Sequence, residues 1–170
     1  MRKYQILIAT ILLAISAILI FSNTARYELT KRINIISAGS YAFSESYEFP
    51  YSEVRVIKAI ENFKEKNPKY QVPAVSIFSN NSFKLEDSRS ENGLWFIAYF
   101  YDADENRIFN IAIRGNETNT TLEFVSINNG LKIGNWKDIN RDFSYDENER
   151  LKNRFEESCL NPIKKLLNNN

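Results

Sequence analysis

The sequence contains no histidine. Histidine is the general base of Ser-His-Asp and Cys-His catalysis, the commonest ligand of transition metals and the side chain that changes charge near neutral pH. Its absence excludes those two catalytic arrangements, imidazole metal sites and a histidine-based pH switch. No other group of residues forms a catalytic motif, so we assign no catalytic residue and expect that the protein is not an enzyme.

Cysteine is almost absent as well, since Cys159 is the only one. A single cysteine excludes an internal disulfide bond, so the core alone must stabilise the fold. Cys159 follows Leu151 and Phe155 at intervals of four residues, on the apolar face of an expected helix. We therefore expect it to be a small core residue, as free cysteines commonly are. Its distance from the N-terminus argues against a lipoprotein anchor.

Glycine is scarce and charge of one sign is not in excess. The five glycines are scattered and form no phosphate-binding loop, and we expect no cofactor. The chain has 22 basic and 21 acidic residues, so it has no basic field that would attract a phosphate backbone. The composition therefore predicts that the protein does not bind nucleic acid.

One long apolar run is present, from Ile6 to Phe21, directly behind Arg2 and Lys3. These 16 residues carry no charge. As a helix they span about 24 Å, slightly less than the ~30 Å hydrocarbon core of a bilayer. The small residues that follow form a poor signal-peptidase site. We therefore predict an uncleaved helix in the cytoplasmic (inner) membrane. Cleavage near residue 25, which would give a secreted or periplasmic protein, is the alternative.

The orientation of this segment is open, because Arg26, Lys31 and Arg32 follow the run and nearly balance the positive charges in front of it. Positive charges that precede an apolar run are typical of a signal segment. This order favours a single-pass protein whose domain lies on the extracytoplasmic side. We divide the chain into a membrane anchor or signal segment (1–25), a juxtamembrane connector with an extended segment (26–51) and one domain (52–170).

The domain has helices at both ends. Residues 52–66 predict a helix that Ser52 caps, with an apolar stripe that includes Ile60 and Phe63. Near the other end, Ser144 and Glu147 have the spacing of a capping box and open a C-terminal helix.

The region between the helices is rich in expected strands. They cover residues 70–79, 94–101, 107–114, 121–127 and 131–136, and Asn129-Gly130 predicts a tight hairpin before the last of them. Residues 94–101 are apolar on both faces, which is typical of a central strand covered on both sides.

This order of elements predicts an α+β fold, in which a helix packs on an antiparallel meander of four or five strands and a C-terminal helix follows. It resembles the cystatin-like and NTF2-like architectures. The resemblance lies in the order of elements alone and implies no activity.

One loop matches the spacing of a calcium-binding loop, from Asp138 to Glu149. It has oxygen-bearing side chains at loop positions 1, 3, 5, 9 and 12, but Phe143 replaces the glycine of position 6. We interpret it as a polar loop in which Ser144 caps the last helix, and assign no metal site. A second acidic cluster, residues 102–105, is expected to be a turn between two strands.

Three functions remain. The first is a membrane-anchored extracytoplasmic interaction module that binds an unidentified protein partner, as a subunit of an envelope complex or as an immunity-type inhibitor. The alternative is a small-ligand-binding or carboxylate-dependent enzyme domain with a pocket between helix and sheet. The third is a purely structural spacer that tethers something near the membrane. A filled core between residues 52–66 and the sheet favours the first.

Overall fold

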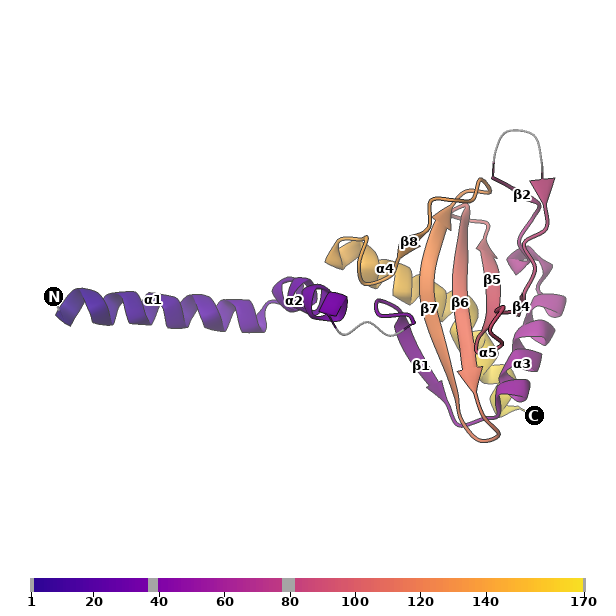
Figure 1. Cartoon of the computed structure of the whole chain (residues 1–170), viewed down its shortest axis with the longest axis horizontal. Helices are drawn as coiled ribbons and strands as arrows, with labels where there is room; N and C mark the ends of the chain where they lie inside the picture. The colour runs from indigo at the N-terminus through magenta and orange to yellow at the C-terminus, as the bar shows by residue number, and fades with distance from the viewer. Residues whose placement is uncertain (1, 37–39, 78–81, 170) are drawn as a thin grey trace. The chain divides into compact units, whose positions relative to one another are not determined.

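The computed structural model describes residues 2–36, 40–77 and 82–169 (Figure 1). The chain divides into two compact units, Met1–Ala42 and Phe43–Asn170. The first unit holds α1 (Arg2–Phe21) and α2 (Asn23–Ile36). Ser22 separates these helices, and its hydroxyl accepts a hydrogen bond from the Ala25 N–H at 3.4 Å.

The helix expected over the apolar run is present as α1. Within the part of the chain that the structure describes, however, no helix combines the length and the apolar character that crossing a membrane requires. The prediction of a membrane-spanning helix is therefore not supported.

The second unit confirms the α+β class. Its described residues form a six-stranded antiparallel sheet in the order β1-β7-β6-β5-β4, with β8 also paired to β7, and a separate two-stranded sheet of β2 and β3. The strands are β1 (Glu45–Phe49), β2 (Val75–Ser76), β3 (Ser82–Phe83), β4 (Ser88–Arg89), β5 (Phe96–Asp102), β6 (Arg107–Gly115), β7 (Thr120–Asn129) and β8 (Lys137–Asp138). The helical segments are α3 (Glu53–Lys66), η1 (Pro68–Tyr70), α4 (Tyr145–Phe155), the π-helical turn η2 (Glu156–Leu160) and α5 (Asn161–Asn168).

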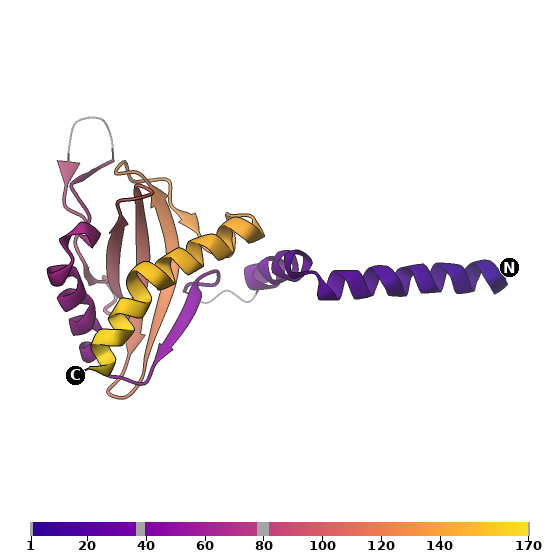
Figure 2. The same cartoon turned by 180° about the vertical axis from the view of Figure 1, so that it is seen from behind.

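Both predicted helix caps are confirmed. The Ser52 hydroxyl accepts from the Arg55 N–H, and the Ser144 hydroxyl accepts from the Glu147 N–H, each at 3.4 Å. The segments α4, η2 and α5 follow one another without a break and cross one face of the sheet as a single long helix, as Figure 2 shows.

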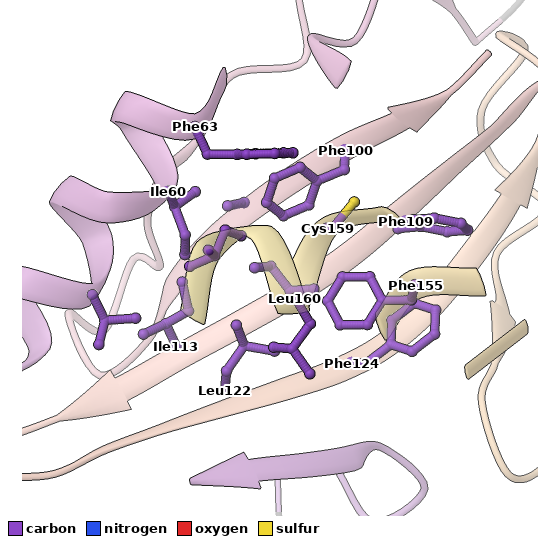
Figure 3. Close-up of a cluster of buried hydrophobic side chains, with 14 of the residues drawn as sticks. Ile60, Phe63, Phe100, Phe109, Ile113, Leu122, Phe124, Phe155, Cys159 and Leu160 are labelled. Atoms are coloured by element: carbon purple, nitrogen blue, oxygen red, sulfur yellow. The ribbon is translucent and has the colours of Figure 1, made fainter. Parts of the chain in front are cut away.

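The core lies between this face of the sheet and the helices (Figure 3). Phe155 is fully buried and stacks on Phe124 at 4.4 Å, while Phe109 meets it edge-on at 5.9 Å. Ile60 and Phe63 bring α3 onto the same cluster. The predicted core position of Cys159 is confirmed, because the residue is fully buried among these side chains.

The strand expected at 70–79 is wrong over most of its length. Tyr70 ends the short helix η1, and only Val75–Ser76 is a strand. Pro68 opens the helix η1, which takes up Tyr70, and Pro73 lacks the N–H that a sheet ladder needs. Residues 78 and 79 lie outside the described residues.

The hairpin expected at Asn129-Gly130 is half right. Gly130 directly follows β7 and has a φ of 77°, but residues 131–136 do not return as a strand. The buried Asn128 amide donates to the carbonyls of Gly130 and Lys132 at 2.9 and 3.0 Å, and so holds the chain as a loop. The returning strand is the shorter and later β8.

Strand β5 is fully covered on one face only. It lies beside the two-residue edge strand β4, and the helices cover only the face to which Ala98 and Phe100 point. Tyr99 and Tyr101 on the other face are half-buried. Tyrosine tolerates such a position because its ring is apolar and its hydroxyl is polar, so an apolar pattern on both faces overstated the burial.

Candidate functional site

The loop from Asp138 to Glu149 does not gather its side chains around one point. The Asp142 carboxylate accepts from the Asp138 N–H at 2.8 Å and pairs with Arg141 at 3.0 Å, which lowers its pKa. Glu149 pairs with Lys152 at 2.5 Å. In the part of the chain that the structure describes, no three acidic or cysteine side chains form a group that would hold a metal ion. The calcium-like spacing therefore has no matching geometry.

The acidic cluster at 102–105 forms the expected turn between β5 and β6. Arg154 of α4 donates to both carboxylate oxygens of the buried Asp102, at 2.6 and 2.9 Å, and to Asp104 at 2.5 Å. Glu105 pairs with Arg107 at 2.8 Å and Arg150 at 2.5 Å. These carboxylates fasten the long helix to the turn and leave no open pair for catalysis.

The face of the sheet opposite the helices offers a better site. Figures 1 and 2 agree that α4 and α5 lie on one side of β5, β6 and β7, and we call the other side the outer face. The loop of residues 130–136 covers part of it, where Trp136 lies 6.0 Å from the Tyr99 ring. The remainder holds a hollow of about 520 Å³, the outer-face hollow, lined by Trp95, Arg114, Gly115, Asn116, Asn119, Thr121 and Glu123.

The pairing of strands brings these residues together. Arg114 of β6 lies opposite Thr121 of β7, and Ala112 lies opposite Glu123. Glu123 in turn lies opposite Ser46 of β1. Segments that are far apart in the sequence thus form one surface.

The acidic part of the hollow is held in place by β1. One oxygen of Glu123 accepts from the hydroxyls of Ser44 and Ser46, both at 2.6 Å. The Thr121 hydroxyl donates to Glu48 at 2.9 Å. Because these bonds fix the Glu123 side chain, its second oxygen is an acceptor in a defined position.

Arg114 is the basic group of the hollow. Its guanidinium lies 5.9 Å from the centre of the Trp95 ring, within the range of a cation–π interaction. It is exposed, and it forms no ion pair with any residue that the structure describes. Arginine and tryptophan are both enriched among the hot-spot residues of protein interfaces.

The turn at the end of the hollow is rigid. A Cβ on Gly115 would lie 2.6 Å from the Asn119 carbonyl oxygen, so only glycine fits there. The Gly115 N–H donates to Glu53 of α3 at 2.8 Å. Asn116 accepts from the N–H groups of Thr118 and Asn119 at 2.8 and 2.9 Å. The hollow is therefore largely preformed.

A second groove, of about 530 Å³, lies between α3 and residues 84–87. In it Lys64 pairs with Asp87 at 2.5 Å, and Asp87 also accepts from the Tyr99 N–H at 3.0 Å. Burial lowers the pKa of Lys64 even though Asp87 acts in the opposite direction. Since each charge is satisfied by the other, the pair joins α3 to the sheet rather than leaving a reactive amine.

Sequence reasoning missed the outer-face hollow. The strand alternation that places Ile113 in the core places Arg114 on the other face, so part of the signal was present. The positions of Glu123 and the serines depend on the register between β1 and β7, which no local pattern gives. No protein-family model matches this chain, and no curated protein resembles it significantly in sequence.

Proposed function

We propose that this protein is a membrane-anchored extracytoplasmic interaction module that binds a protein partner through the outer-face hollow. Two partner classes fit, an envelope complex that includes this chain as a subunit and a toxin that it inhibits as an immunity-type protein. The observation that carries the proposal is the filled space between α3 and the sheet.

Side chains occupy the place where an enzyme or carrier of this architecture would hold its ligand. Phe63 lies 6.1 Å from Phe100 and 5.0 Å from Tyr70, measured between ring centres. Ile60 and Ile113 are fully buried beside them (Figure 3). An interior packed in this way leaves recognition to the surface.

The outer-face hollow has the composition of a binding surface. Trp95 provides an aromatic anchor, Arg114 provides a cation without an ion pair among the described residues, and Glu123 provides a fixed acceptor. Arg114 in particular suits a partner that presents a carboxylate, because a guanidinium binds a carboxylate with two parallel hydrogen bonds.

The anchor is the proposal's second part, and it rests on the sequence. The uncharged run from Ile6 to Phe21 follows Arg2 and Lys3, as in a signal-anchor segment. Arg26 and Arg32 of α2 suit contact with anionic headgroups just beyond such a segment. A secreted or periplasmic protein cleaved near residue 25 is the alternative.

Crosslinking in membranes tests partner binding. The full-length tagged protein is crosslinked in its native membranes, purified and analysed by mass spectrometry. We expect recovery of one specific protein, and an Arg114→Glu variant that recovers at least about tenfold less, as for a hot-spot residue. Lys58→Glu on α3, away from the outer face, is the matched control. Equal recovery by both variants would reject the outer-face hollow, and repeated recovery of no specific protein would reject the module.

A small-ligand-binding or carboxylate-dependent enzyme domain is the second candidate. The groove beside Lys64 and Asp87 favours it, because Glu61, Glu65 and Glu86 line the same groove. The paired state of Lys64 and Asp87 weighs against catalysis there. Specific binding of a soluble ligand that Glu65→Gln abolishes would favour this function over the first.

A further inference from the structure

A third hollow, of about 320 Å³, lies where the end of α3, the short helix η1 and the C-terminal helix meet. Its apolar walls come from Phe63, Tyr70, Pro162 and Leu166. Three lysines also line it, Lys66, Lys69 and Lys165, and we call it the lysine hollow.

None of the three lysines forms an ion pair with the residues that the structure describes. Lys69 acts electrostatically on the Asp104 carboxylate, and its ammonium group lies 5.1 Å from the centre of the Tyr70 ring. Glu157 is the single carboxylate in the lining, so the hollow has a local excess of two positive charges. Lys66 and Lys165 lie in the last turns of α3 and α5, where a cation is favourable. The helix termini therefore account for Lys66 and Lys165 but not for Lys69, which lines the same hollow.

The C-terminal helix departs from α geometry at this hollow. The Asn161 N–H bonds to the Glu156 carbonyl, five residues back, and forms the π-helical turn η2. Pro162 has no N–H, so it cannot donate to the Ser158 carbonyl four residues back. Ser158 and Pro162 both line the hollow. Such π-helical turns occur frequently at functional sites.

We propose that the lysine hollow binds an organic anion, a phosphate or carboxylate group carried on an apolar body. The tilted Phe63 and Tyr70 rings, 5.0 Å apart, and Leu166 provide apolar contact. The ammonium groups neutralise the anionic group. The volume is at the small end of ligand sites, which suits a single ring or short chain. This site is independent of the outer-face hollow.

Binding of three small molecules distinguishes the contribution of the anionic group from that of the apolar body. Phenyl phosphate, inorganic phosphate and benzyl alcohol are titrated by calorimetry into the full-length protein in a non-ionic detergent. We expect saturable binding of phenyl phosphate with a Kd below about 1 mM, weaker binding of phosphate and none of benzyl alcohol. The affinity for phenyl phosphate decreases as salt is added. No saturation by phenyl phosphate, or equal affinity for phenyl phosphate and phosphate, would overturn the proposal.

Variants then locate the site. Lys66→Gln, Lys69→Gln and Lys165→Gln each weaken phenyl phosphate binding by about two- to fivefold, as expected for one exposed charge pair. The triple variant abolishes binding while its thermal unfolding midpoint stays close to that of the original protein. Lys58→Gln, also an exposed lysine of α3, is the matched control and retains binding. A triple variant that binds as before would place the anion elsewhere and overturn the assignment.

Discussion

The thiol of Cys159 shows how burial sets the chemistry of a side chain. Its sulfur lies in η2, 3.5 Å from the Ser158 hydroxyl, and the residue is fully buried. Burial raises the pKa of this thiol from 9.0 to about 12, so the nucleophilic thiolate is absent at neutral pH. We infer that Cys159 is structural.

The same shift predicts a loss of stability at alkaline pH. Between pH 9 and 12 the unfolded thiol of Cys159 ionises while the folded one stays protonated. The folded state then binds more protons, so stability is full below pH 9 and falls by up to about 1.4 kcal/mol per pH unit above it. Urea unfolding from pH 7 to 11 measures this slope, which we expect Cys159→Ala to flatten.

Tyr47 provides the control for that experiment. Burial and the neighbouring Glu156 carboxylate raise the pKa of its phenol from 10.0, so Tyr47 adds a second loss that begins near pH 10. Tyr47→Phe removes the later component only. A Cys159→Ala protein with an unchanged slope between pH 9 and 10 would show that the thiol is not the titrating group.

Gly115 carries a second prediction at the residue scale. Because an added Cβ would lie 2.6 Å from the Asn119 oxygen and 2.9 Å from the Thr120 Cα, Gly115→Ala must displace backbone. We expect it to cost about 1–3 kcal/mol of unfolding free energy, as overpacking does. Gly93→Ala is the comparison, since nothing lies within 4 Å and only a φ of 70° opposes it. A larger loss at Gly93 than at Gly115 would contradict this account.

At the scale of elements, the Asn128 side chain holds the loop of residues 130–136 together with backbone hydrogen bonds between Ser76 and the loop. The Asn128 amide is fully buried and donates to two loop carbonyls, while its oxygen accepts from the Asn135 N–H at 3.4 Å. Asn128→Ala leaves buried polar groups without partners, and we expect a loss of about 1–3 kcal/mol.

Proteolysis measures the consequence for the loop. Asn128→Ala should speed limited cleavage within residues 130–136 and lower the midpoint of urea unfolding. Asn129→Ala is the control, because Asn129 is exposed and its side chain makes no comparable bonds to the loop. An Asn128→Ala protein as resistant as the control would show that other contacts hold the loop.

Local sequence patterns predicted where helices and strands lie better than they predicted which strands pair with each other. Ser52 and Ser144 gave both helix starts, and the alternation of β6 gave the face that points to the core. The pairing of β1 with β7 joins residues about 80 positions apart, such as Glu45 and Phe124, and depends on tertiary packing. The outer-face hollow was missed because it requires that pairing, and residues 131–136 were misassigned because Asn128 outweighed their strand propensity.

At the scale of the whole molecule, the proposed function assigns a separate role to each of the two compact units: the first anchors the protein and the second binds the partner. Residues 43–170 form a packed domain with a preformed surface, and residues 1–42 hold the apolar run and the basic residues of α2. With 22 basic and 21 acidic residues, the chain has almost no net charge to steer a charged partner over long distances. Recognition then depends on short-range contacts, which require that the domain be held near its partner.

The proposed topology predicts the outcome of protease treatment. We expect the purified protein to have the mass of the full chain, and protease added to intact spheroplasts to digest the domain. A mass that begins near residue 25 would instead mean a secreted or periplasmic protein, in which capture of a toxin becomes the better-supported role. A full-length chain that is protected until the cells are lysed would place the domain in the cytoplasm and contradict the extracytoplasmic proposal. The anion site is unaffected by any of these results, because the lysine hollow lies wholly within residues 63–166.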